Sequence, residues 1–206
     1  MPLLALAAAA TLLFSPVRMP PIDECSSDKS FDAFRSELRK TVARRDGSAL
    51  TAILSKDVLA DFGGGEGRKE FARIWKLSRP KSSPIWAELE RALRLGCSMA
   101  HGSPAIPYLA EGFTSEGDLF DKMVVVEPGA TMREQARENA KPIARLDYHV
   151  VQVGDVSRQD GWVLAKLADG RRGYIRRDQL RSALDYRAGF QKRGGRWFMT
   201  SFVQGD

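Results

Sequence analysis

Hydrophobic residues recur at helical spacing in the first half of the chain. Phe31, Phe34, Leu38 and Val42 lie three or four positions apart, and lysine and arginine residues occupy positions between them. This spacing places the apolar side chains on one face, so an amphipathic helix is predicted over residues 31–45. The same kind of pattern predicts three further helices, over residues 48–54, 68–77 and 85–95.

In the second half of the chain the pattern changes to one of short strands. Val163, Ala165 and Leu167 alternate with Trp162, Leu164 and Lys166, which is typical of a strand with one buried face. Further short apolar runs occupy residues 123–126, 143–146 and 148–153. Residues 186–191 and 196–203 are predicted to form a closing hairpin. Its last strand has apolar residues on both faces and should be covered on both sides.

Turn residues divide these strands. Asp169-Gly170 predicts a tight hairpin, because both positions tolerate positive φ. Gly173, next to Tyr174, indicates a close approach of two backbones at a barrel corner. Short strands separated by turns predict a small β-barrel. We expect its interior to include Val125, Leu146, Val151, Trp162 and Ile175.

The two patterns together predict an α+β protein with several parts. We expect an N-terminal helical domain over residues 22–118, a small β-barrel over 119–184 and a C-terminal β-hairpin over 185–206. The hairpin packs on either the barrel or the helical domain. Residues 98–117 are rich in Gly, Ser and Pro and are interpreted as a connector.

The N-terminus carries the only long apolar run, LLALAAAATLLF at residues 3–14. It is too short to span a bilayer comfortably, and its composition is typical of a secretory signal peptide. Residues 1–21 are therefore predicted to be a signal peptide, with no stable membrane span after its removal. The expected location is the periplasm or the outside of the cell. The alternative is an N-terminal core helix of the mature protein.

Cys25 and Cys97 are the only cysteines. An even number of cysteines in an exported protein usually forms disulfides, so a Cys25–Cys97 bridge is predicted. The alternative is a pair of buried thiols in a cytoplasmic protein without a signal peptide. The question of the bridge and the question of export are therefore linked.

The formal net charge is +6, and it is unevenly distributed. Residues 1–120 hold 16 basic and 15 acidic residues, whereas residues 121–206 hold 16 and 11. An anionic partner such as a wall polymer is one interpretation, and an ordinary solvated surface is the other. Nucleic acid is not expected, because no helix-turn-helix or stacking motif is present.

The sequence offers little for catalysis. The glycine loop at residues 63–67 precedes a helix and could hold an anion, but it lacks the Lys-Ser/Thr ending of a P-loop. Cys97 and His101 have no orienting third group, and two cysteines with two distant histidines do not make a zinc site. We therefore expect no enzyme activity, no catalytic or metal-binding residues and no cofactor.

The strand region resembles a bacterial Src-homology-3-like domain. The resemblance rests on Met132-Arg133, Ile143 and Leu146, Gly161-Trp162 and Gly173-Tyr174-Ile175, which follow the order and spacing of that family. It covers about a third of the chain. It implies a small barrel that binds cell-wall peptides or other ligands and is rarely catalytic.

Two sets of residues are candidates for ligand binding on this domain. Tyr148 and Tyr174 could line a peptide groove together with Trp162, although Trp162 also fits core packing. The arginines of one hairpin and its following turn, Arg171, Arg172, Arg176 and Arg177, could bind carboxylates or phosphates, or they could form a solvated rim. The sequence thus predicts a non-enzymatic exported binding module of the bacterial cell envelope. It would recognise a wall peptide, an anionic polymer or an envelope protein.

A second resemblance supports an alternative function. The N-terminal helices with the FGGGEG loop at residues 62–67, and the closing hairpin with Gly195-Arg196-Trp197, resemble the two ends of a nuclear-transport-factor-like cone. That family forms a pocket between helices and a curved sheet. The resemblance implies a protein with a small-molecule pocket and a possible enzymatic function.

Overall fold

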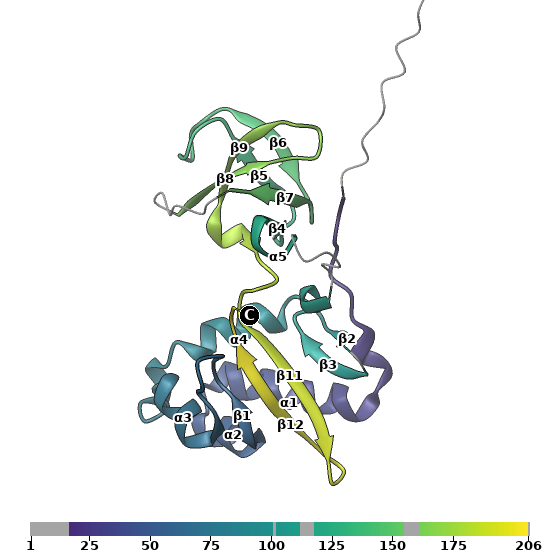
Figure 1. Cartoon of the computed structure of the whole chain (residues 1–206), viewed down its shortest axis with the longest axis vertical. Coiled ribbons are helices and arrows are strands. Elements are labelled where there is room, and N and C mark those ends of the chain that lie inside the picture. The colour runs from purple at the N-terminus through teal and green to yellow at the C-terminus, as the bar shows by residue number, and fades with distance from the viewer. Residues whose placement is uncertain (1–16, 101, 112–117, 155–160, 206) are drawn as a thin grey trace, which may run out of the picture.

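The computed structural model describes residues 17–100, 102–111, 118–154 and 161–205. These residues form two β-sheets (Figure 1), a five-stranded one below that is covered by helices and a seven-stranded one above. The mixture of helices and strands confirms the α+β class.

Four helices accompany the lower sheet: α1 (Lys29–Arg44), α2 (Gly47–Ile53), α3 (Gly67–Ile74) and α4 (Ile85–Leu93). Each lies within two or three residues of a predicted helix. The Asp28 carboxylate caps α1 by accepting hydrogen bonds from the backbone N–H groups of Ser30 and Phe31. Asp46 caps α2 in the same way through Ala49.

The five-stranded sheet has the order β1-β12-β11-β3-β2. Its strands are β1 (Leu54–Leu59), β2 (Ser98–Ala100), β3 (Ser103–Ile106), β11 (Arg187–Arg193) and β12 (Arg196–Val203). The closing hairpin β11–β12 therefore lies in the middle of the helix-covered sheet, with β1 parallel to β12. Of the two positions predicted for this hairpin, the structure has the one on the helical part.

The interpretation of residues 98–117 as a connector is wrong for their first half, which forms β2 and β3. These strands have only three and four residues, so no alternating pattern marks them in the sequence. The predicted helical domain thus contains a sheet. A further short helix, η3 (Tyr108–Glu111), follows β3.

Aromatic side chains fill the space between the helices and this sheet. Phe31 contacts Phe190 with ring centroids 5.2 Å apart, and Trp75 contacts Phe202 at the same separation. All four side chains are buried. The interior is a packed core, as expected for close-packed protein interiors.

The seven-stranded sheet has the order β10-β4-β7-β8-β9-β5-β6. All of its strands lie within the predicted range 119–184. The predicted β-barrel is not closed among the described residues, because the end strands β6 and β10 do not pair with each other. A short helix α5 (Asp118–Asp121) precedes it. The strands are β4 (Lys122–Val125), β5 (Ala130–Arg133), β6 (Pro142–Leu146), β7 (Val150–Val153), β8 (Trp162–Lys166), β9 (Arg172–Arg176) and β10 (Leu180–Arg181).

The interior of this sheet contains four of the five expected residues, Val125, Leu146, Val151 and Ile175. Trp162 is the exception. It pairs with Arg176 on the outer face, while the next residue, Val163, points into the core. The predicted alternation of inward and outward side chains along this strand is therefore confirmed. The prediction that Trp162 lies in the interior is wrong, because the small aliphatic residues face inward and Trp162 faces outward.

Gly173 lies where two strands come close together. A Cβ atom at this position would be 2.6 Å from the carbonyl oxygen of Arg133 on β5. The predicted close approach of backbones is confirmed, and only glycine fits without a shift of the neighbouring strand.

The part of the chain that forms the seven-stranded sheet is inserted, in the sequence, between two strands of the five-stranded sheet. The chain leaves the lower sheet after β3 and returns to it at β11, and these two strands are direct neighbours through Ile106–Ala188 and Ala105–Gly189. The insertion therefore begins and ends at one place in the lower sheet.

A third chain segment joins the two sheets. Residues 17–23, here called the strap, run along the side of the molecule from the upper sheet to the lower one (Figure 1). At the upper end, Val150 donates its backbone N–H to the Val17 carbonyl at 2.9 Å, and Met19 donates to the Tyr148 carbonyl at 2.8 Å. At the lower end, Cys97 donates to the Ile22 carbonyl at 3.0 Å.

The strap overlaps the predicted signal peptide. Residues 1–16 lie outside the described residues, but residues 17–21 take part in the fold through the bonds above. The predicted boundary of the signal peptide at residue 21 therefore falls inside the described fold. No described helix is long and apolar enough to cross a membrane.

The disulfide lies at the lower end of the strap. Cys25 in η1 (Glu24–Ser27) bonds to Cys97 with Cα atoms 5.7 Å apart, and both residues are buried. The Cα separation is typical of a disulfide, and the predicted bridge is present. Gly96 lies so close that a Cβ there would be 2.0 Å from the Ile22 carbonyl oxygen.

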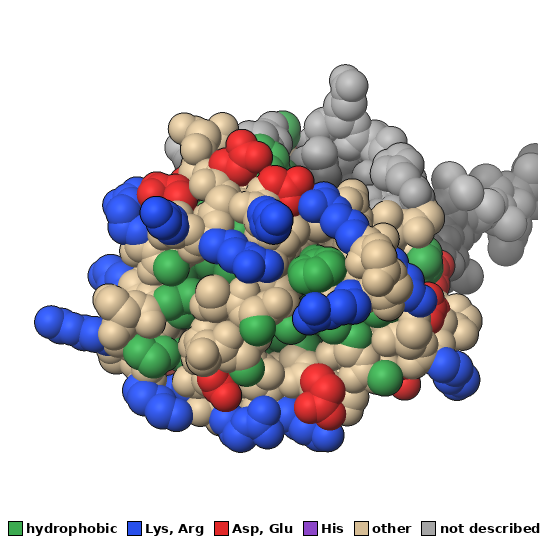
Figure 2. Space-filling model, turned by 90° about the horizontal axis from the view of Figure 1, so that it is seen from below, with side chains coloured by type: hydrophobic (Ala, Val, Ile, Leu, Met, Phe, Trp, Pro, Cys, Tyr) green, Lys and Arg blue, Asp and Glu red, His purple; other side chains and the backbone are tan. Residues whose placement is uncertain are grey.

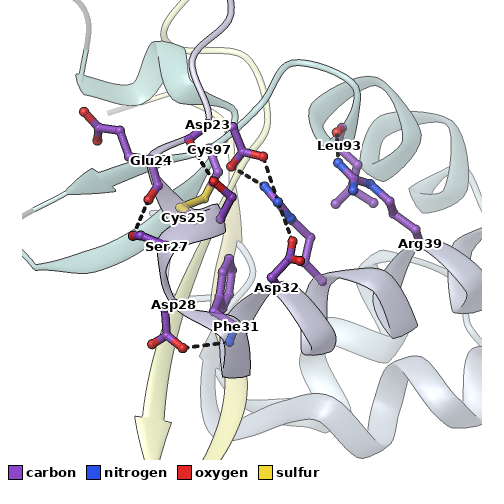
Figure 3. A network of polar contacts seen from close by, with 12 residues as sticks. Asp23, Glu24, Cys25, Ser27, Asp28, Phe31, Asp32, Arg39, Leu93 and Cys97 are labelled. Carbon is purple, nitrogen blue, oxygen red and sulfur yellow. Dashed lines mark hydrogen bonds and ion pairs between the residues drawn. A yellow bond between two sulfur atoms is a disulfide. The ribbon is translucent and has the colours of Figure 1, made fainter.

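A buried arginine forms an ion pair with the same end of the strap. Arg35 of α1 is only 3% exposed, and it donates to both carboxylate oxygens of Asp23, at 2.6 and 2.8 Å. It also donates to Asp32 at 2.7 Å. Figure 3 shows Asp23 and Asp32 close to the disulfide between Cys25 and Cys97. The hydrogen bonds from Arg35 lower the pKa of the Asp23 carboxyl below its usual value.

Removing the disulfide should destabilise the fold. The two cysteines are 72 positions apart, so the double variant Cys25→Ser, Cys97→Ser gains conformational freedom in its unfolded state. The expected loss is about 2–4 kcal/mol of unfolding free energy. Denaturant titration under non-reducing conditions measures it. Equal midpoints for the variant and the wild type would contradict a stabilising bridge.

Two apolar residues on the β8–β9 hairpin should respond differently to truncation. Ile175 is fully buried in the core of the sheet, so Ile175→Ala should cost about 2–5 kcal/mol. Leu164 lies on the outer face and is 52% exposed, so Leu164→Ala should change stability by less than about 0.5 kcal/mol. Similar losses for the two variants in chemical denaturation would show that the inner and outer faces are misassigned.

The contact between Arg35 and Asp23 should make stability depend on acid pH. Because the pKa of Asp23 is lowered in the folded state, its contribution is present above the ordinary value of 3.8 and is lost as pH falls below it. Asp23→Asn should therefore be less stable than the wild type at neutral pH, and the gap should narrow towards pH 2. Unfolding curves at several pH values test this. A gap that is independent of pH would refute it.

Candidate ligand-binding cleft between the two sheets

Two adjoining cavities lie where helix α4 faces the outer side of the seven-stranded sheet. Their volumes are about 620 and 560 Å³, and five charged residues line both of them. We call the pair the junction cleft. The larger cavity is also lined by Pro21, Tyr148 and Tyr186, and we call it the strap-side cavity. The smaller cavity is also lined by Trp162, and we call it the Trp162-side cavity. The shared residues are Arg91, Arg94, Glu127, Arg176 and Asp178.

Residues on both sides of the junction line the cleft. Glu88 and Arg91 are three positions apart on α4, and Arg94 follows at its C-terminal end, so all three lie on one side of the helix. Arg176 ends β9, and η4 (Arg177–Gln179) follows it directly. The cleft exists because the inserted sheet is held against α4.

Trp162 and Arg176 form the wall of the smaller cavity. The Arg176 guanidinium lies 5.6 Å from the centre of the Trp162 ring, in a cation–π contact. Trp162 is 5% exposed although it is outside the core of the sheet. Arg176 also pairs with Glu138 at 3.2 Å. An aromatic face next to a fixed cation suits a ligand that carries both apolar and anionic groups.

Charges in the larger cavity are matched one to one, with a single exception. Five arginines and four carboxylates line it. The four ion pairs are Arg91–Glu88 at 3.6 Å, Arg94–Glu127 at 3.8 Å, Arg176–Asp178 at 3.4 Å and Arg177–Asp185 at 3.0 Å. The fifth arginine, Arg181, has no carboxylate within 4.0 Å among the described residues.

Arg181 is a buried cation. It follows Leu180 on β10, and since Leu180 packs into the sheet's core, the Arg181 side chain points the other way, into the junction. It is 5% exposed, and its Nη2 donates to the Tyr186 carbonyl. Its Nε is buried and has no hydrogen-bond partner among the described residues. Burial lowers the pKa of its guanidinium, although Asp185 and Glu88 nearby favour the charged form.

The structure places only some of the predicted ligand residues in the cleft. Arg176 lines both cavities, and Tyr148 and Arg177 line the larger one. Arg171 pairs with Asp169 at 2.7 Å instead, and Arg172 and Tyr174 lie opposite Lys166 and Leu164 farther along the outer face. These three line neither cavity of the cleft. The predicted basic rim and the junction cleft overlap at Arg176 and Arg177.

Sequence reasoning missed the residues that complete the cleft. Arg91 and Arg94 lie opposite the apolar stripe of a predicted helix, where charged residues are usually solvated. Arg181 follows a strand-forming residue and carries no motif. No local signal brings these three together, since their proximity depends on how the two sheets are joined.

The other candidate groups lie outside the cleft. The loop at residues 63–67 is occupied by the Asp61 carboxylate, which accepts a hydrogen bond from the Gly65 N–H at 2.9 Å. His101 lies outside the described residues, and Cys97 has no free thiol. His149 is buried, and its Nδ1 accepts a hydrogen bond from the Asp147 backbone N–H at 3.0 Å. Burial lowers the pKa of His149, as expected for a structural histidine.

No known family model matches this sequence, and comparisons with curated proteins and with solved structures find no significant similarity. Function is therefore inferred from the geometry of the chain itself.

Proposed function

We propose that this protein is a non-enzymatic exported binding module of the bacterial cell envelope, and that its ligand binds in the junction cleft. The observation that carries the proposal is the convergence of arginines from α4, β9 and β10 in two adjoining cavities, one of which is also lined by Trp162. A cleft lined by both charges and by an aromatic ring suits a peptide with carboxylate groups, such as a cell-wall peptide.

Two features support export. The buried disulfide Cys25–Cys97 is of a kind that forms and persists in oxidising compartments. The described helices are too short or too polar to cross a membrane, which fits a protein released from its signal peptide.

The inserted sheet is, in this proposal, a Src-homology-3-like domain. Its support is the β8–β9 hairpin, with Gly161-Trp162 at its start and Gly173-Tyr174-Ile175 on its second strand, and the close approach of β5 at Gly173. Binding on the outer face beside Trp162 agrees with the binding role of that family.

The helix-covered sheet is proposed to be a nuclear-transport-factor-like cone. Two observations support this proposal. In the strand order, β1 runs parallel to the last strand, β12. Helices cover one face of the sheet (Figure 1). Aromatic side chains, among them Phe31, Phe71 and Phe190, fill its interior. We therefore place the ligand at the junction rather than inside the cone.

Charge reversal in the cleft tests this function. Arg91→Glu with Arg94→Glu should weaken binding to purified cell-wall fragments by about tenfold or more, because two exposed cations of the cleft become anions. Binding of the wild type should also weaken as salt rises. A pull-down with quantified wall fragments measures both effects.

The matched control is Arg171→Glu with Arg172→Glu, which makes the same change in net charge away from the cleft. Lysine and arginine side chains are also scattered over the end of the molecule far from the inserted sheet (Figure 2), so general basicity alone would not distinguish the cleft. Equal losses for the two double variants, or undiminished binding by the cleft variant, would contradict the proposal.

A further inference from the structure

We propose that the strap-side cavity binds the terminal carboxylate of a short peptide, and that Arg181 is the residue that anchors it. This deepens the proposed function and rests on it, because it names the group of the wall peptide that the cleft recognises.

The charge pairing in the cavity carries the inference. Asp185 is already used twice: Arg177 donates to its Oδ1 at 3.0 Å, and the Ser182 backbone N–H donates to its Oδ2 at 3.0 Å. Glu88 pairs with Arg91 on its own helix at 3.6 Å. The two acidic groups that favour charged Arg181 from a distance thus have arginines of their own.

An arginine in this state is unusual for a purely structural residue. A buried cation is costly unless it has a counter-ion and enough hydrogen bonds. Arg181 has one hydrogen bond, to the Tyr186 carbonyl, and its Nε has no partner among the described residues. A ligand carboxylate would supply the missing charge, and the planar guanidinium can bind it with two donors.

The surroundings select a single negative charge. Five arginines and four carboxylates leave the cavity one positive charge in excess, which a carboxylate neutralises and a dianion such as a phosphate group exceeds. The remaining walls include apolar or aromatic side chains that can cover the small side chain next to a peptide terminus. These are Pro21, Leu95, Val126, Tyr148 and Tyr186.

The test compares acetyl-D-alanyl-D-alanine with its C-terminal carboxamide. The full-length wild-type protein should bind the free acid at least about tenfold more tightly than the amide in isothermal titration calorimetry. Arg181→Met, which keeps an extended side chain without charge, should remove this preference. The control Arg172→Met changes an exposed arginine on β9 and should leave the preference intact.

A second probe separates this inference from the proposed function. Sodium acetate carries a carboxylate but no wall peptide, and the Nε–H signal of Arg181 in a ¹⁵N–¹H spectrum reports directly on its guanidinium. Acetate should shift this signal in the wild-type protein and leave the other arginine signals of the cleft in place.

Together, the two experiments distinguish failure of the carboxylate site from failure of the wall-peptide function. Equal binding of acid and amide would overturn the carboxylate site and leave a wall-peptide cleft in place. A shift with acetate but no binding of either peptide would support the carboxylate site and contradict the wall-peptide function. No peptide binding and no shift would overturn both.

Discussion

The contact between the two sheets depends on a small apolar cluster at their junction. Leu109 and Val124 are fully buried in this cluster, one from η3 after the lower sheet and the other from β4 of the inserted sheet. Met19 of the strap packs against them, and the Tyr108 hydroxyl donates to the Met19 carbonyl. Burial of these side chains removes apolar surface of both sheets and of the strap from water at once.

The polar features of the junction follow from this cluster. The strap can pair with β7 at one end and with Cys97 at the other only while both sheets keep their relative position. The disulfide and the Arg35–Asp23 contact then secure the lower end. In turn, α4 and β9 stay close enough for their arginines to line one cleft, which neither sheet would form alone.

Local structure could be predicted from the sequence much better than this arrangement. The spacing of Phe31, Leu38 and Val42 identifies α1, and Asp169-Gly170 identifies the β8–β9 hairpin, because both signals are contained in a few neighbouring residues. The short strands β2 and β3 carry no such signal. The pairing of β3 with β11 joins residues about eighty positions apart, so neither the insertion nor the closing hairpin's place in the lower sheet could be predicted.

The candidate site shows the same limit. Arg176 could be predicted from the sequence because it belongs to a hairpin rich in basic residues. Tyr148 could be predicted because it is an aromatic residue at the start of a predicted strand. Arg181 was not, because its importance lies in the absence of a nearby carboxylate and in its burial. Trp162 was identified as a large buried residue, but the face on which it is buried depends on the register between β8 and β9.

We expect the two sheets to form one rigid body, with the cleft between them. Residual dipolar couplings of the backbone N–H groups test this claim most directly, because they report the orientation of each sheet separately. We predict that a single alignment tensor fits the couplings of both sheets in the oxidised protein. Two clearly different tensors would mean that the sheets reorient independently, and would contradict the existence of a preformed cleft.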